Sequence, residues 1–177
     1  MKLHLGCGKR DFGDSWVHVD MEAYPHIQYK DITDLNFCQD NSVDLIYASH
    51  VLEYFDREES VKVLNEWRRV LKPKGILRLA VPDFNKLSHL YYNNLVELDQ
   101  ILGPLYGKMN NPPIYHKTVY DFISLKSLLE GLGFFDIKRY NWRDTEHANF
   151  DDHSQAYIPH MNKDNGILIS LNVEATK

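Results

Sequence analysis

The sequence has little cysteine and no long apolar run. Its only two cysteines in 177 residues, Cys7 and Cys38, are too few for a disulfide framework or a four-cysteine zinc site. The longest apolar runs have the length of a β-strand, not of a membrane span. Residues 1–4 lead directly into a predicted strand, without the apolar core of a signal peptide. We therefore expect a cytoplasmic protein with no membrane partner.

An excess of positive charge is also missing. The 20 Lys and Arg residues are outnumbered by 25 Asp and Glu residues, which gives a formal net charge of −5. Such a chain offers no basic field for a nucleic-acid backbone, so we expect no nucleic-acid partner. The hydrophobic fraction of 44% is that of an ordinary globular domain. We predict a single domain over residues 1–177, and the sequence does not predict an oligomeric state.

Apolar runs and helical patterns alternate along the chain. Residues 43–48 and 76–81 are nearly continuous apolar runs, which are typical of parallel strands covered on both faces. Between them, residues 57–71 carry apolar side chains at helical spacing, and Pro73 and Gly75 end the pattern. This predicts a βαβ unit. Further strands are predicted at residues 2–5, 17–19, 27–29, 134–140 and 167–174, and further helices at residues 83–102 and 125–132, the latter with Ser124 as N-cap.

A glycine turn at the end of the first predicted strand is the most informative local feature. The apolar residues 3–5 run into Gly6, Cys7 and Gly8, and the two glycines permit a sharp turn and close approach of a ligand. Asp20 follows the apolar stretch 16–19 and would accept hydrogen bonds from ribose hydroxyls at the tip of the next parallel strand. Because a lone Gly-x-Gly also occurs in ordinary turns, other segments have to support this interpretation.

Four segments together resemble the class I S-adenosylmethionine-dependent methyltransferases, in particular the small, type 11-like methyltransferase domains. They are the glycine motif at residues 3–8, the acidic strand end at 17–20, the strand-four motif Asp-Leu-Ile-Tyr-Ala-Ser-His-Val-Leu-Glu at 44–53, and the helix with its stop signal at 66–75. The resemblance covers nearly the whole chain. It implies a Rossmann-like, doubly wound α/β fold in three α/β/α layers. The implied sheet has seven strands and is mostly parallel, with the last strand antiparallel.

The resemblance also implies S-adenosylmethionine as cofactor and assigns residues to it. The methionine part would lie against Gly6, Cys7 and Gly8, the ribose against Asp20, the adenine beside Asp31 and Ile32, and the methionine end or the acceptor near Ser49 and His50. In a parallel sheet these positions share the carboxyl edge, so we expect them to converge on one crevice. Two simpler interpretations stay open, in which Asp31 caps a turn and Cys7 only packs at the glycine turn.

Two features depart from the family pattern. Only residues 6–16 separate the first two predicted strands, so the usual first helix must be short or irregular. Tyr54 stands where the strand-four motif often has a second histidine, and no role can be carried over from that histidine.

Methyl transfer mainly requires that donor and acceptor be held in near-attack geometry, without a metal or a covalent nucleophile. An acceptor that carries a proton would also need a general base, a role that suits histidine. We name His116 as the catalytic candidate, since its loop precedes the third predicted helix. The other candidates are His50, His89 and His153, and Glu53 would either orient His50 or cap local structure. Residues 103–120 and 141–165 are expected to form loops on the acceptor side.

Two clusters have alternative interpretations. Residues 146–154 include the potential metal ligands His147, Asp151, Asp152 and His153, but their spacing matches no strong metal motif, and we predict no metal. A solvated loop or a surface that recognises a hydroxyl-rich acceptor are the alternatives. An aromatic group would form either an acceptor wall or ordinary helix packing; it comprises Tyr91, Tyr92, Tyr106, Tyr115 and Tyr120.

The predicted function is methyl transfer from S-adenosylmethionine to a small polar acceptor. By analogy with similar domains, we favour a sugar or a cell-surface-polysaccharide precursor. One alternative is a non-catalytic S-adenosylmethionine-binding module of a larger complex. A nicotinamide-dependent dehydrogenase is disfavoured because the glycine loop lacks a third glycine at the expected spacing.

Overall fold

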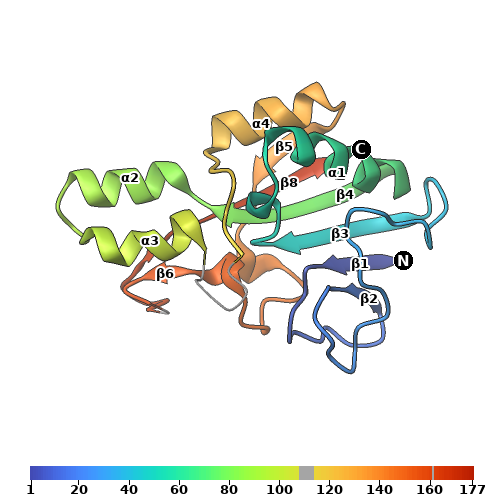
Figure 1. Ribbon diagram of the computed structural model, residues 1–177, viewed down its shortest axis with the longest axis horizontal. Helices are drawn as coiled ribbons and strands as arrows, with labels where there is room; N and C mark the ends of the chain where they lie inside the picture. Colours follow the sequence, from blue (N-terminus) through green and yellow to red (C-terminus); the bar gives the residue numbers. More distant parts are fainter. Residues whose placement is uncertain (108–113, 161) are drawn as a thin grey trace.

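A six-stranded, mostly parallel sheet forms the centre of the computed structural model, which describes residues 1–107, 114–160 and 162–177. Its strand order is β2-β1-β3-β4-β8-β5 (Figure 1). The strands are β1 (Lys2–Leu5), β2 (Trp16–Val19), β3 (Val43–Ser49), β4 (Leu71–Pro82), β5 (Phe135–Arg139) and β8 (Ser170–Thr176). Strands β1 to β4 are parallel to one another, and β8 runs antiparallel to both β4 and β5.

The seventh strand of the implied sheet is reduced to a single bridge. Within the predicted strand 27–29, only Tyr29 forms a parallel bridge, to Val19. The side chain of Gln28 explains part of this difference, because its Oε1 accepts a 2.6 Å hydrogen bond from the backbone N–H of His18. A regular ladder would use a backbone carbonyl there. Two further short strands, β6 (Tyr157–Ile158) and β7 (Ile167–Leu168), pair with each other in a separate antiparallel sheet.

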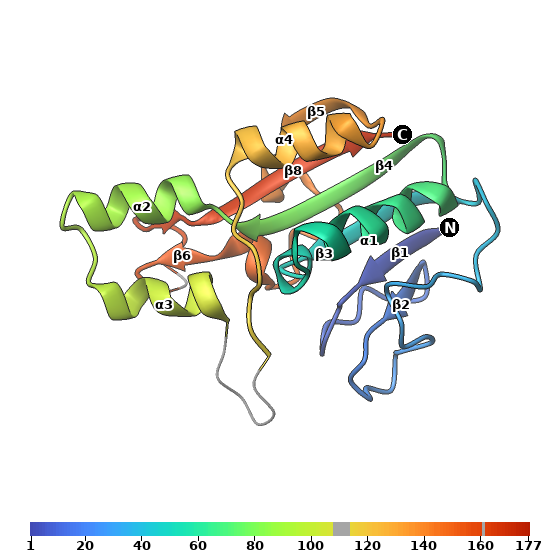
Figure 2. The ribbon, with the colours of Figure 1, turned by 45° about the horizontal axis from the view of Figure 1, so that its top comes forward.

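Two helices cover one face of the main sheet (Figure 2). Helix α1 (Arg57–Val70) begins at a capping box in which Asp56 and Glu59 satisfy each other's backbone N–H groups. Helix α4 (Phe122–Gly131) has Asp121 as its N-cap, so the prediction of Ser124 was wrong. Ser124 instead occupies the third helical position of a similar box.

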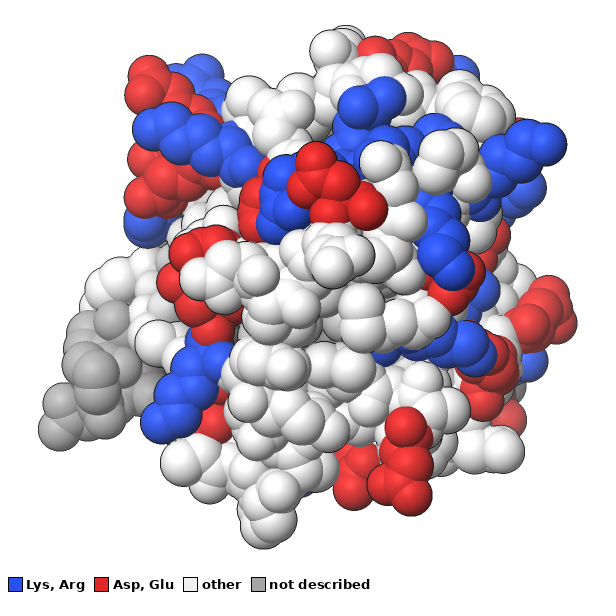
Figure 3. All heavy atoms as spheres, turned by 90° about the vertical axis from the view of Figure 1, so that its right-hand side faces the viewer, with Lys and Arg blue, Asp and Glu red and all other residues white. Residues whose placement is uncertain are grey.

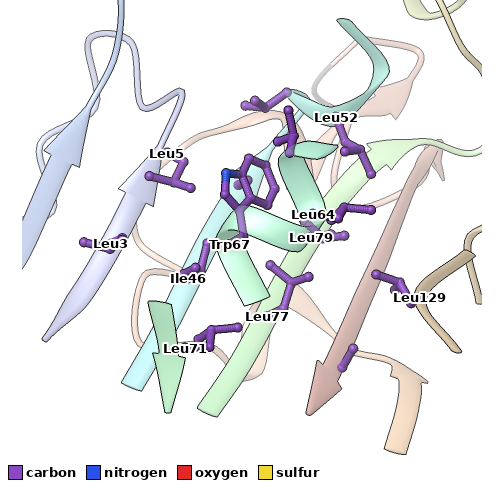
Figure 4. Packing of buried hydrophobic residues seen from close by; sticks show 14 of the residues in the cluster. Leu3, Leu5, Ile46, Leu52, Leu64, Trp67, Leu71, Leu77, Leu79 and Leu129 are labelled. Atoms are coloured by element: carbon purple, nitrogen blue, oxygen red, sulfur yellow. The ribbon is translucent and has the colours of Figure 1, made fainter. Parts of the chain in front are cut away.

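The main core lies between these helices and the sheet. Trp67 of α1 is fully buried and lies over Ile46 and Leu77 of the sheet (Figure 4). Its indole N–H donates a 2.7 Å hydrogen bond to the backbone carbonyl of Ile32. The helical spacing of apolar residues read from the sequence thus corresponds to the buried stripe of α1.

The single helix predicted at residues 83–102 was wrong, because two helices occupy this region. Helix α2 (Phe84–Tyr92) ends at Asn93, and Asn94 has a positive φ of 55°, so the chain leaves the helical path there. Helix α3 (Leu98–Tyr106) returns, and both helices contribute to a second apolar cluster. Helix α3 continues past Gly103, where the sequence predicted the start of a loop. Residues 108–113 of that predicted loop lie outside the described residues.

Aromatic rings and short turns cover the opposite face of the sheet. Phe12 and Trp16 pack there on Leu45 and Tyr47, and the 3-10 helix η3 (His153–Gln155) contacts β4 and β8. Residues 6–15 form turns and no helix, as the short separation of the first two strands predicted. Within the described residues, loops and short turns therefore form the third layer on this face of the sheet.

The described surface bears no single-sign charge field on the side near the N-terminus, where Lys and Arg alternate with Asp and Glu (Figure 3). No helix within residues 1–107, 114–160 and 162–177 has the length and apolar character needed to cross a bilayer.

Candidate functional site

The carboxyl ends of β1, β2, β3 and β4 lie along one edge of the sheet, because these four strands are parallel. The glycine turn 6–8 follows β1 and Asp20 follows β2. Ser49 ends β3 and His50 comes directly after it. The topology thus places these predicted site residues at a common edge, which is where open α/β sheets bind their ligands.

The two glycines of the turn have different surroundings. Both have positive φ angles, 65° at Gly6 and 54° at Gly8. A Cβ on Gly6 would lie 2.3 Å from Cγ2 of Val51, whereas a Cβ on Gly8 would meet nothing within 4 Å. Gly6 is therefore required for packing, and the backbone at Gly8 borders open space, as a ligand-binding peptide would.

Asp20 connects the glycine turn to the end of β2. Its Oδ2 accepts a 2.7 Å hydrogen bond from the backbone N–H of Gly8, and its Oδ1 accepts a 2.8 Å bond from that of Glu22. The residue is only 8% exposed. A carboxylate has about four acceptor positions, so each oxygen keeps capacity for one ribose hydroxyl.

Cys7 is a buried, unreactive thiol. Burial, with a contribution from the charge of Asp20, raises its pKa to about 12, which leaves the sulfur protonated at neutral pH. The neighbouring His26 holds the turn from outside, since its Nε2 lies 3.0 Å from the carbonyl oxygen of Gly8. These contacts favour the packing interpretation of Cys7.

Asp31 and Ile32 have structural contacts of their own. Oδ1 of the exposed Asp31 accepts hydrogen bonds from the backbone N–H and the hydroxyl of Thr33, at 2.7 and 2.6 Å, and these bonds lower the pKa of Asp31. Asp31 therefore caps a turn. Ile32 packs on the core, and its carbonyl accepts the bond from Trp67.

Ser49 and His50 end β3 with an unusual backbone and an unpaired hydroxyl. His50 has a φ of 54°, which is uncommon for a residue with a side chain and is typical of functional sites. Ser49 is 8% exposed, and its hydroxyl has no hydrogen-bond partner among the described residues. A buried hydroxyl of this kind suits a bound polar ligand.

Three ionisable side chains meet beside this strand end. Oε1 of Glu53, in the 3-10 helix η1 (Leu52–Tyr54), lies 3.5 Å from Nδ1 of His50 and 3.9 Å from Nε2 of His116. Burial raises the pKa of Glu53 to about 8 and lowers the pKa values of both histidines. Nδ1 of His116 lies 3.0 Å from the carbonyl oxygen of Pro104. The candidate base His116 thus shares Glu53 with His50, and its side chain is only 6% exposed.

The structure adds residues that sequence reasoning missed. Because β8 is antiparallel, its first residues reach the same edge, where Ser170 lies 3.2 Å from Nε2 of His50 and bonds to Asn172. The alternation Ser-Leu-Asn-Val at 170–173 was the available signal. Asp83, directly after β4, is 1% exposed, caps α2 and pairs with Arg139 at 3.3 Å.

The potential metal ligands within residues 146–154, where no metal was predicted, have separate structural partners. His147 packs on Phe12 with ring centroids 5.1 Å apart, and Asp152 accepts a 2.5 Å hydrogen bond from the hydroxyl of Tyr47. Asp151 pairs with Lys163 at 3.0 Å. Across the parts of the chain that are described, no group of three or more His, Cys, Asp or Glu residues could hold a metal ion.

The remaining histidines and tyrosines divide by location. The ring of His153 is 5.1 Å from that of His50, whereas His89 lies on α2 with Asn93. Tyr120 is buried, with its hydroxyl 2.9 Å from that of Ser60. The other candidates for an acceptor wall are exposed; they are Tyr91, Tyr92, Tyr106 and Tyr115.

Comparison with known proteins finds methyltransferases, by a partial sequence match and by similarity of fold. Residues 15–79 match a family model described as "Methyltransferase domain", and no curated protein sequence matches the chain. A SAM-dependent methyltransferase from Archaeoglobus fulgidus is 18% identical with a TM-score of 0.63, over 99% of this chain and 85% of that one. One from Mesorhizobium loti is 16% identical with a TM-score of 0.58, over 99% and 90% of the two chains.

A third similar structure comes from Burkholderia thailandensis. It is a 1,6-didemethyltoxoflavin-N1-methyltransferase with bound 1,6-didemethyltoxoflavin and S-adenosylhomocysteine, 13% identical with a TM-score of 0.57, over 99% of this chain and 70% of that one. The fold is that of the class I methyltransferases. The chain thus shares its fold with SAM-dependent methyltransferases, and its residues 15–79 match the methyltransferase domain model.

Proposed function

We propose that this protein binds S-adenosylmethionine at the carboxyl edge of β1–β3 and transfers its methyl group to a small polar acceptor. The observation that carries the proposal is the arrangement of Gly8, Asp20 and Ser49 at this edge. The backbone of Gly8 borders open space, Asp20 keeps free acceptor capacity, and the buried hydroxyl of Ser49 has no partner among the described residues. When bound, the cofactor would supply an electrophilic methyl group on a sulfonium.

The chain's own residues would hold this cofactor and keep the reaction in line. Asp20 would accept the ribose hydroxyls, and the glycine turn would lie against the methionine part. Asp31 and Ile32 would flank the adenine. Because the thiol of Cys7 stays protonated, it offers no competing nucleophile to the methyl group.

For the acceptor we propose a small polar molecule, with a sugar or a polysaccharide precursor as the first class to screen. The net charge of −5 does not favour a polyanion. Ser170 and Asn172, at the same edge as His50, fit a substrate with hydroxyl groups. One similar structure holds the small molecule 1,6-didemethyltoxoflavin, and another is a complex with the Trm112 activator, so a protein partner is a second class to test.

His116 stays our proposed general base for an acceptor that loses a proton. Its Nδ1 is occupied by the carbonyl of Pro104, so proton uptake would use Nε2, the nitrogen that faces Glu53. In an acceptor screen, His116→Ala should lower kcat with little change in the dissociation constant of S-adenosylhomocysteine. An unchanged kcat on the true acceptor would remove His116 from the mechanism.

Calorimetric titration with S-adenosylhomocysteine tests cofactor binding without knowledge of the acceptor. We expect micromolar affinity, and no binding of NADH. In Asp20→Asn, one oxygen still accepts a backbone N–H but the charge and one acceptor atom are lost, so the affinity should fall roughly tenfold or more. Asp14→Asn, on the exposed loop before β2, is the matched control.

Two results would contradict this proposal. If the wild-type protein bound NADH and not S-adenosylhomocysteine, the dehydrogenase interpretation would replace it. If Asp20→Asn bound as tightly as the wild type while remaining folded by circular dichroism, the ribose assignment would be wrong.

A further inference from the structure

The hydrogen bonds around His50 determine which of its ring nitrogens carries the proton. The side-chain N–H of Asn172 donates to the carbonyl of Ser154 at 2.9 Å, so Oδ1 of Asn172 is the acceptor of the 2.9 Å bond from the hydroxyl of Ser170. The Ser170 oxygen is then available to accept, and Nε2 of His50 lies 3.2 Å from it. His50 therefore has its proton on Nε2 and a lone pair on Nδ1, the nitrogen that faces Glu53.

The hydrogen bond of His116 likewise shows which of its ring nitrogens carries the proton. A carbonyl oxygen can only accept, so Nδ1 of His116 must donate to Pro104. A neutral ring then has a lone pair on Nε2, and this nitrogen also faces Oε1 of Glu53. Two lone pairs from two histidines are thus directed at one carboxyl group.

Glu53 has little to stabilise it as a carboxylate, because its own backbone N–H lowers its pKa less than burial raises it. It is 1% exposed, and neither of its oxygens has a hydrogen-bond partner on another of the described residues. The distances to the histidines are 3.5 and 3.9 Å, so an O–H of Glu53 can donate to only one ring at a time and must move roughly 0.5–1 Å closer to it. An ionised carboxylate at this position would face two lone pairs, with its own backbone N–H as the donor.

We propose that Glu53 is a positioning residue whose undissociated carboxylic acid keeps its own proton and donates a hydrogen bond to His50 or His116, and so holds His50 neutral with its proton on Nε2. The pKa of about 8 that burial gives Glu53 agrees with this protonation state at neutral pH. The inference rests on the proposed function for its purpose, because a neutral His50 would avoid repulsion with the sulfonium that the site is proposed to hold.

The other ionisable groups around this cluster are compatible with the proposal. Burial first, and then the neighbouring His153, His116 and Arg10, lower the pKa of His50. Around Glu53, burial raises the pKa values of Tyr54 and Tyr120, and the carboxyl group adds to the shift. Neither tyrosine is ionised at neutral pH, so these neighbours leave the proton with Glu53.

Two variants separate the donor role of Glu53 from its volume. Glu53→Gln retains a donor in the same place, since its amide N–H can point at either lone pair. Glu53→Leu keeps a similar size and has no donor. Glu58→Gln, on the exposed start of α1, controls for the loss of one carboxylate.

The first measurement reads protonation directly and needs no ligand. In the wild type at pH 7, infrared difference spectra against Glu53→Gln should show the carbonyl band of an undissociated acid. Histidine nitrogen NMR should show a neutral His50 with its proton on Nε2 and a neutral His116 with its proton on Nδ1. Glu53→Gln should preserve both tautomers, and Glu53→Leu should lose the single tautomer of His50.

The second measurement connects this state to the site, with S-adenosylhomocysteine as the probe. Wild-type affinity should weaken as the pH rises through about 8, whereas Glu53→Gln should keep a flat profile over the same range. At pH 7, Glu53→Leu should bind roughly tenfold more weakly, the effect of one lost hydrogen bond to a charged or buried group.

The outcomes distinguish the two proposals. An ionised Glu53 at pH 7, or a His50 with its proton on Nδ1, would overturn the positioning role even if S-adenosylhomocysteine bound well. Failure of the wild type to bind the probe, with the undissociated acid and both tautomers present, would contradict the proposed function and leave the proton arrangement supported.

Discussion

At the residue scale, the glycine turn has two different reasons for its two glycines. Gly6 has both a left-handed backbone and no room for a Cβ, because Val51 occupies that space. Gly8 has the left-handed backbone but borders open space. The first glycine is thus required by the folded core and the second by the proposed ligand.

Alanine substitutions should separate these reasons. Gly6→Ala combines about 1–2 kcal/mol for the left-handed backbone with overpacking of about 1–3 kcal/mol against Val51. Gly8→Ala should lower the free energy of unfolding by the backbone contribution alone, and it should also weaken S-adenosylhomocysteine binding. Chemical denaturation measures the first effect and calorimetry the second, with Gly13→Ala as the control, since its φ is 83° and its surroundings are open. Equal destabilisation at Gly6 and Gly13 would contradict the assignment.

At the scale of elements, α1 connects the core to the adenine side of the proposed site. Its buried face packs on the sheet, and Trp67 extends from it to the backbone carbonyl of Ile32. The loop after the Val19–Tyr29 bridge is therefore held by a helix rather than by a full strand. The Trp67–Ile32 hydrogen bond thus holds a segment that only one bridge attaches to the sheet.

Trp67→Phe should weaken that loop selectively. The ring is largely retained, but the buried carbonyl of Ile32 loses its donor, which costs about 1–3 kcal/mol in the free energy of unfolding. Hydrogen exchange of the amides at residues 31–33 should speed up more than that of the β3 amides. Lys62→Ala, on the exposed side of the same helix, should change neither quantity. A uniform increase in exchange would indicate a general core effect instead.

At the scale of the whole molecule, buried ionisable groups limit the pH range of stability from both sides. Burial lowers the pKa values of five histidines in the folded state: His4, His18, His50, His116 and His147. Their contribution is present above the unfolded pKa of about 6.5 and is lost as the pH falls. Glu53 has a raised pKa, so its contribution is fully present below about 4.5 and is lost as the pH rises toward 8.

The free energy of unfolding should therefore decrease on both sides of a narrow pH optimum. Glu53→Gln should abolish the decrease on the alkaline side. Thermal unfolding of the wild type should show that stability falls below pH 6.5, with a steepness that indicates uptake of more than one proton on unfolding. Glu53→Gln should gain stability over the wild type between pH 5 and 8, increasingly with pH, and show the same acid loss. Glu58→Gln should follow the wild type throughout. A constant difference between Glu53→Gln and the wild type across this range would show that Glu53 does not titrate there.

The sequence by itself determined the features that depend on local pattern. The apolar runs predicted β1, β3 and β4, and helical spacing predicted α1, because strand and helix periodicities are short-range properties. The glycine turn, Asp20 and His50 could be placed at one edge because parallel strands leave no other arrangement. The break at Asn93 and the cap at Asp121 were missed, since a turn residue and its competitors differ by small energies.

Only the tertiary structure decided which distant side chains meet. Ser170 and Asn172 reach His50 because an antiparallel strand enters the sheet in one register, and no local signal encodes that register. Glu53 is buried between His50 and His116 because separate segments close over it. The protonation of such a group depends on the solvent and donors removed from it, which is a property of the packed molecule and not of the sequence around Glu53.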